Sequence, residues 1–170
     1  MDLLEAPRVV ERPEQHYLGI RVITPFRGML AKRNELLDEL FGWLRTAGVD
    51  DSGMFFLRLH VIDMNGPMDL EVGVTTPGPL TGDARVRPDV LPAGRYVTLT
   101  YRNHSLRANR ALLDFAGAED LTLDRRDVAE GDLFGCRYEL FRTDPRKEPR
   151  KTKWEVELNI RLAEPPGTGD

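Results

Sequence analysis

The 170-residue sequence has one cysteine, three histidines and no long apolar run. The lone Cys136 excludes a disulfide within the chain and fits a reducing compartment. The three histidines lack the ligand spacing of a zinc site, so we expect no metal and no cofactor. No stretch reaches the roughly 18 apolar residues of a membrane-spanning helix, and the acidic first residues differ from a signal peptide. We therefore expect a cytoplasmic protein without a membrane partner.

An excess of positive charge is also missing. The chain has 24 lysine and arginine residues against 28 acidic ones, which gives a net charge of −4. Binding to nucleic acid normally needs a basic surface that displaces counterions from the phosphates, so nucleic acid is not expected as a direct partner. A net negative charge is compatible with a cationic partner. The hydrophobic fraction of 41% is ordinary for a globular domain.

Hydrophobic periodicity predicts the same series of elements twice. In the first half it predicts a strand within 16–26, a helix within 28–48 and strands within 52–63 and 68–76. In the second half it predicts a strand within 94–103, a helix with Ser105 as its N-cap, and two strands joined by a charged hairpin within 135–162. The predicted fold class is α+β: tandem duplicated βαββ units with pseudo-twofold symmetry. They form an antiparallel sheet with helices on one face and a ligand cleft on the other.

These elements predict one domain over 17–163, composed of repeat one (17–76), a linker rich in proline and glycine (77–91) and repeat two (92–163). An N-terminal lead-in of 1–16 and a flexible tail of 164–170 flank it. The lead-in is too short for a helix-turn-helix domain. We therefore expect a stand-alone binder and not a complete transcription factor.

One face of the predicted sheet mixes aromatic, hydroxyl and carboxylate side chains. If the apolar strand positions pack under the helices, the alternate positions line the cleft, and Glu139 is the acid expected there. Aromatic rings and a carboxylate both attract positive charge, so a flat cationic ligand suits this face. An alternative is that the face is simply solvated. The strand positions predicted to bind the ligand are Glu139, Tyr96, Phe56, Phe141, Tyr17, Met54, His60, Glu71 and Glu157.

Several runs of residues resemble a known family. LPAGRYVTLTY, CRYELFRTDPRKEP and KWEVELNIRL, in this order after a first half that ends in DLEVGVTTPG, resemble the gyrase-inhibitor-like (GyrI-like) small-molecule-binding domain. That domain also forms the effector-binding part of multidrug-responsive transcription regulators. The resemblance implies that Glu139 meets the positive charge of lipophilic cations and that Trp154 helps to wall the pocket. Strand alternation, however, places Trp154 with the core-facing Val156.

Three functions stay open. The first, which we predict, is a stand-alone multidrug-type protein that captures lipophilic or cationic aromatic compounds. The second is a hydrolase of reactive small molecules, which the family resemblance implies, with Glu139 as general base and Tyr101 or Tyr96 as proton donor. The third is binding of an unidentified protein partner through the basic hairpin tip within 146–153, where the alternative is a solvated loop.

Overall fold

The structure is a computed structural model that describes residues 1–165. Most of the expected tail, 166–170, lies outside the described residues. The elements in chain order are β1 (Asp2–Arg12), β2 (Gln15–Pro25), α1 (Met29–Ala47), β3 (Phe55–Ile62), β4 (Pro67–Thr75), β5 (Arg87–Leu91), β6 (Gly94–Arg102), α2 (Ser105–Ala118), β7 (Arg125–Val128), β8 (Gly131–Phe134), β9 (Arg137–Phe141), a short 3-10 helix (Lys151–Lys153) and β10 (Glu155–Arg161).

One antiparallel sheet contains all the strands, in the order β1-β6-β10-β9-β3-β4-β2-β5, with the hairpin β7–β8 attached to β3. The first βαββ unit consists of β2, α1, β3 and β4, and the second of β6, α2, β9 and β10. Strands β3 and β9 pair with each other at the middle of the sheet, and each unit continues outward from there. The predicted α+β class with tandem βαββ units is therefore confirmed.

The predicted lead-in and linker each contain a strand that sequence reasoning missed. Strand β1 runs directly into β2 but pairs with β6, as in Val9↔Val97. Strand β5 runs directly into β6 but pairs with β2, as in Tyr17↔Asp89. The strand that precedes each unit in the chain therefore pairs with the edge strand of the other unit. The connections β1–β2 and β5–β6 are two residues each, so the sheet must curve until its two ends approach each other.

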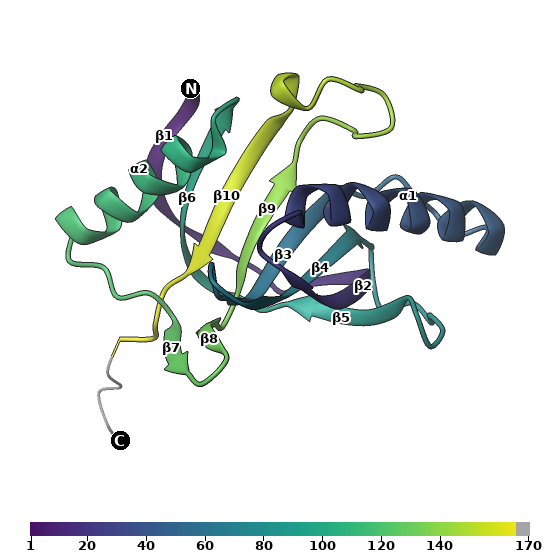
Figure 1. Cartoon of the computed structure of the whole chain (residues 1–170), viewed down its shortest axis with the longest axis horizontal. Helices are drawn as coiled ribbons and strands as arrows, with labels where there is room; N and C mark the ends of the chain where they lie inside the picture. The colour runs from purple at the N-terminus through teal and green to yellow at the C-terminus, as the bar shows by residue number, and fades with distance from the viewer. Residues whose placement is uncertain (166–170) are drawn as a thin grey trace.

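Both helices lie on one face of the sheet, over opposite ends. Helix α1 packs on β2 and β4, and α2 packs on β6 and β1. Figure 1 shows β9 and β10 running between the two helices. Helix α1 ends at Gly48, whose φ of 66° suits glycine. The expected Ser105 cap is instead the first helical residue of α2, after His104. Within 1–165 no helix is long and apolar enough to cross a membrane.

The face away from the helices has a small core of its own. Its buried residues come from β2, β3, β5, β6 and β9 and the segment just before β9, and they are Tyr17, Phe56, Leu91, Tyr96, Cys136 and Tyr138. The strand connections near Leu91 help to cover this face as the sheet curves. The alternative of a simply solvated face is therefore wrong for its centre. Cys136 is 1% exposed and lies in this core.

Candidate functional site

Glu139 lies on the helix side of the sheet, which corrects the sequence prediction. It pairs with Leu57 on β3 and with Leu158 on β10. Residues directly opposite each other in a sheet share a face, and Leu57 and Leu158 belong to the core under the helices. Phe141, two residues further along β9, lies on this helix side as well. The alternation in β9 was ambiguous because both of its faces are largely buried.

A row of paired residues crosses the six central strands of the sheet at Glu139. The row contains Ile20, Val72, Leu57, Glu139, Leu158 and Leu99. The five apolar members are at most 2% exposed, whereas Glu139 remains partly exposed. Solvent therefore reaches the Glu139 carboxylate, whereas every other side chain in the row is buried.

Aromatic side chains lie close to Glu139 on the helix side. The rings of Phe141 and Trp154 are 5.2 Å apart between centroids. Trp154 belongs to the helix-side core, so the strand alternation was right and no bulge turns it to the other face. Its indole N–H donates a 2.8 Å hydrogen bond to the carbonyl of Glu148 in the hairpin tip. Tyr101 of β6 is also buried on this side.

The Glu139 carboxylate accepts no hydrogen bond from a residue within 1–165. Burial raises its pKa, and the nearby positive charges of Arg33 and Arg137 act in the opposite direction. Burial likewise raises the pKa of Tyr101, and the negative charge of Glu139 raises it further. The site therefore pairs an acid that resists ionisation with a phenol that stays neutral. We call Arg33, Tyr101, Glu139, Phe141 and Trp154 the Glu139 cluster.

Arg33 is the member of this cluster that sequence reasoning missed. It sits in the core-facing stripe of α1 with Leu36, Leu37, Leu40 and Leu44. Leu30, near the start of α1, lies outside this stripe and is 53% exposed. The signal was a charged residue three and four positions before Leu36 and Leu37, which places it on their face of a helix. The Arg33 guanidinium lies 5.3 Å from the Trp154 ring centroid and 5.7 Å from that of Phe141.

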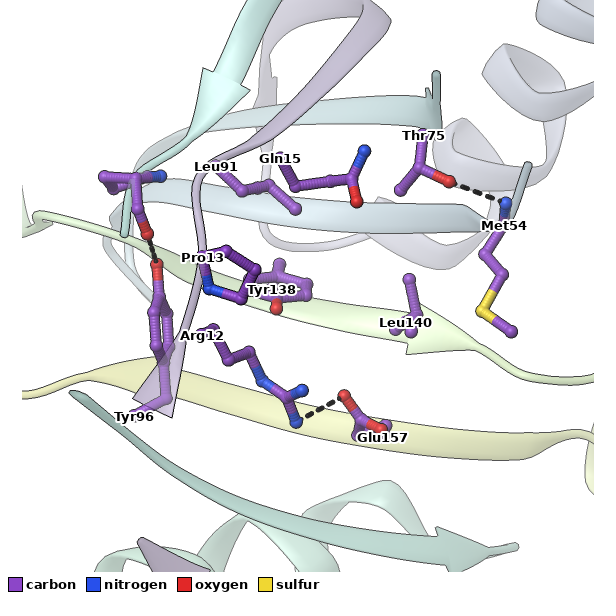
Figure 2. A pocket seen from close by; sticks show the side chains of 11 residues that line it. Arg12, Pro13, Gln15, Met54, Thr75, Leu91, Tyr96, Tyr138, Leu140 and Glu157 are labelled. Atoms are coloured by element: carbon purple, nitrogen blue, oxygen red, sulfur yellow. Dashed lines mark hydrogen bonds and ion pairs between the residues drawn. The ribbon is translucent and has the colours of Figure 1, made fainter. Parts of the chain in front are cut away.

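A pocket of about 190 Å³ opens on the opposite, helix-free face. Figure 2 shows its floor of β9 and β10 side chains beneath the connection between β1 and β2. Of the predicted ligand-binding residues it brings together Met54, Tyr96 and Glu157. Sequence reasoning missed the rest of the lining, which includes Arg12, Pro13, Gln15, Thr75, Leu91, Pro92, Tyr138 and Leu140. Half of these, Arg12, Pro13, Leu91 and Pro92, lie in or next to the strands β1 and β5 that were not predicted.

The charged side chains of this helix-free pocket and the Tyr96 hydroxyl already have partners. Arg12 donates to Glu157 at 2.9 Å (Figure 2) and to Asn159 at 3.1 Å. Arg142 donates to the other Glu157 oxygen at 2.5 Å and also bonds Glu5. The Tyr96 hydroxyl donates to the Pro92 carbonyl at 2.6 Å. Glu157 therefore serves as the centre of an internal ion-pair network.

Three further predicted residues, Tyr17, His60 and Glu71, form a buried network with Arg58. The Tyr17 hydroxyl donates to Glu71 Oε1 at 2.7 Å and accepts from Arg58 at 3.0 Å. His60 Nε2 lies 2.8 Å from the same Glu71 oxygen. Phe56 stacks edge-on against Tyr17 with centroids 4.9 Å apart. These side chains hold the helix-free core together, and Glu71 also borders a second pocket of about 570 Å³ beside β5.

The described residues 1–165 contain no group of three or more histidine, cysteine, aspartate or glutamate side chains arranged to hold a metal ion. The candidate small-molecule sites are the Glu139 cluster on the helix side, the pocket on the helix-free side and the pocket beside β5; no member of the Glu139 cluster lines either pocket.

A family model for the GyrI-like small molecule binding domain matches residues 5–163. The chain belongs to this family. The match begins within β1, so the GyrI-like domain includes the strand that the sequence prediction had assigned to a lead-in. No curated protein matches the sequence significantly.

Solved structures share the GyrI-like fold at low sequence identity. EcmrR in complex with DNA has a TM-score of 0.69 and 16% identity over 95% of this chain, which spans 59% of the EcmrR chain. The isolated EcmrR C-terminal domain has a TM-score of 0.65 and 17% identity, with 96% of this chain and 100% of that domain covered. SAV2435 bound to tetraphenylphosphonium has a TM-score of 0.61 and 10% identity, with 92% and 93% covered. A hydrolase from Listeria innocua has a TM-score of 0.58 and 13% identity, with 94% and 92% covered.

Proposed function

We propose that this GyrI-like domain captures lipophilic or cationic aromatic compounds at the Glu139 cluster. The observation that carries the proposal is the partly exposed Glu139 carboxylate, which has no hydrogen-bond donor among the described residues and interrupts an otherwise apolar row. A carboxylate that is only partly exposed and has no donor in the protein is incompletely hydrated, which costs free energy. A ligand that supplies positive charge or a donor next to this carboxylate recovers that cost.

The surroundings of Glu139 support an aromatic ligand with positive charge. Phe141 and Trp154 are buried, at 2% and 4% exposed, and their rings lie on the same side of the sheet as the acid. Ring faces attract cations, most strongly where water is excluded. The similar fold of SAV2435, which is bound to the lipophilic cation tetraphenylphosphonium, makes that compound a sensible probe.

The carboxylates of the helix-free face are weaker candidates for a ligand. Glu157 already bonds Arg12 and Arg142, and Glu71 is paired with Tyr17 and His60. A ligand cation would have to replace these internal partners, whereas at Glu139 it meets an unoccupied acceptor.

The test is a titration of the protein with tetraphenylphosphonium, followed by calorimetry, for the parent and for Glu139→Gln. Glutamine keeps the shape and removes the charge, so we expect the binding free energy to weaken by an amount on the order of 1–3 kcal/mol. The affinity for the neutral triphenylphosphine oxide should fall less in Glu139→Gln. Met54→Ser is the matched control, because Met54 lines only the helix-free pocket. A weaker affinity of Met54→Ser with an unchanged affinity of Glu139→Gln would contradict the proposal.

A second function is hydrolysis of a reactive small molecule with Glu139 as general base. It is favoured by one observation, that the neutral phenol of Tyr101 lies within the electrostatic field of Glu139. A base and a proton donor would thus act from one side of the sheet. If the parent consumes a reactive ester and Glu139→Gln binds it normally without turnover, the glutamate acts on the chemical step.

A further inference from the structure

Arg33 is a buried guanidinium without an ion-pair partner in the part of the chain that the structure describes. It is 9% exposed, and its nitrogens donate only to Oδ1 of the adjacent Asn34, at 3.2 and 3.0 Å. Buried arginines are usually paired with a carboxylate, because an isolated charge is costly to remove from water. The rings of Trp154 and Phe141 contact its guanidinium instead.

Arg33 and Glu139 interact electrostatically without a salt bridge. Burial lowers the pKa of Arg33, and Glu139 is the largest influence in the opposite direction. Arg33 is in turn the largest influence that opposes the raised pKa of Glu139. The Arg33 guanidinium therefore interacts with both the Glu139 carboxylate and the two rings. These same groups would attract a cationic ligand.

We propose that Arg33 is a resident cation of the site formed by Glu139, Phe141 and Trp154, and that it competes with cationic ligands for this site. The inference rests on the proposed function, since it concerns selectivity at the same cluster. A second positive charge at contact distance is repelled, and the repulsion is strong where water is scarce. A cation must therefore displace Arg33 from the rings before it binds.

Arg146 shows how a structural arginine in the same protein differs. It also stacks on two rings, at 5.7 Å from the Phe41 centroid and 5.0 Å from that of Phe55. Its guanidinium, however, is bonded to Asp51 and to Asp144. Arg146 thus fixes the hairpin tip over α1 and β3 by ion pairs that no small ligand needs to break. To make room for a ligand, Arg33 would break only its ring contacts and its hydrogen bonds to the Asn34 amide.

The test compares tetraphenylphosphonium affinity between the parent, Arg33→Met and Arg33→Lys. Methionine retains an apolar stem and removes the charge, so we expect binding at least about tenfold tighter, as for removal of one like charge near the ligand. Lysine keeps the charge and should bind the cation about as the parent does. The affinity for neutral triphenylphosphine oxide should change by less than about threefold, because the oxide carries no net charge to be repelled. Adding Glu139→Gln to Arg33→Met should reverse the gain.

The outcomes separate this inference from the proposed function. Unchanged or weaker cation binding by Arg33→Met, together with a clear loss in Glu139→Gln, overturns the role of Arg33 and leaves the proposed function intact. Absence of cation binding in both the parent and Arg33→Met overturns both. Binding by Arg33→Met alone supports the role of Arg33 and overturns the proposed function of the parent. Arg33→Gln provides the same comparison if the methionine variant does not fold in a thermal melt.

Discussion

Replacement of Gly73 by alanine tests how tightly the helix-free core is packed. Gly73 pairs with Phe56 across β3 and β4 and with Gly19 across β2 and β4. A Cβ atom at residue 73 would lie 2.4 Å from Cζ of Phe56 and 2.9 Å from its Cε1. The Phe56 ring fills the space beside Gly73.

Phe56 has little freedom to move away from a new methyl group. It is 0% exposed, with Tyr17 at 4.9 Å on one side and Tyr138 at 6.0 Å on the other, measured between ring centroids. Carbon atoms prefer separations of about 3.5–4.0 Å, so the ring would have to shift by about 1 Å. Overpacking of this kind costs about 1–3 kcal/mol, and we expect Gly73→Ala to lose that much stability in urea denaturation.

Gly42→Ala is the matched control with the opposite sign. Gly42 lies inside α1, and no atom lies within 4 Å of a Cβ placed there. Alanine should therefore stabilise the helix by about 0.5–1 kcal/mol. In a Phe56→Leu background the clash at residue 73 is relieved, and the cost of Gly73→Ala should shrink. Equal stability of Gly73→Ala and the parent, or an unchanged cost in the Phe56→Leu background, would refute the packing argument.

Three other predictions concern stability. Leu158→Ala should lose about 2–5 kcal/mol in a urea melt, since Leu158 is buried beside Glu139, whereas the exposed Lys151→Ala should change stability by less than about 0.5 kcal/mol. The raised pKa of Glu139 means that the folded state holds its proton more tightly than the unfolded state. The stability of the parent relative to Glu139→Gln should therefore be highest below the ordinary glutamate pKa of about 4.3 and fall as pH rises through the folded pKa. A flat difference across that range would contradict the raised pKa. Tyr17→Phe should cost about 1.5–3 kcal/mol, because its hydroxyl bonds charged partners. Tyr96→Phe should cost only about 1 kcal/mol, because its partner is a neutral carbonyl; equal losses in paired melts would argue against this ranking.

Local periodicity was sufficient to predict the six strands and two helices of the duplicated units. It failed for β1 and β5, whose apolar residues do not alternate with polar ones and which are mostly exposed. Those strands are stabilised by pairing with the distant unit, and this pairing leaves no local alternation to detect. Their position also decides the helix-free pocket, so Arg12 and Leu91 could not be predicted as its lining.

The failure at β9 has a different cause. Alternation identifies the buried face of a strand only when the other face meets water. In β9 the helix side receives Phe141 and the helix-free side receives Tyr138, and both are at most 6% exposed. The curvature that buries the second face results from the crossing of β1 and β5 to opposite units. The local sequence of residues 137–141 does not reveal that β1 and β5 pair with opposite units.

The pairing register also shows which acid departs from the internal duplication. Around the central pair Leu57↔Glu139, the first unit continues to Val72 and the second to Leu158. Glu71 precedes Val72 and Glu157 precedes Leu158, so these two acids occupy equivalent positions, and both are held by internal partners. The equivalent of Glu139, by contrast, is the apolar Leu57.

An acid shared by both units is explained by duplication and by its internal partners. An acid present in only one unit, at a position where its counterpart is a 1% exposed leucine, has no such explanation. Within 1–165 Glu139 has no hydrogen-bond donor, and the positive charges of Arg33 and Arg137 act on it without a salt bridge, so its carboxylate remains free to accept a bond from a ligand. Its position on the helix side therefore favours a ligand there over one in the helix-free pocket, where the carboxylates already have a structural use.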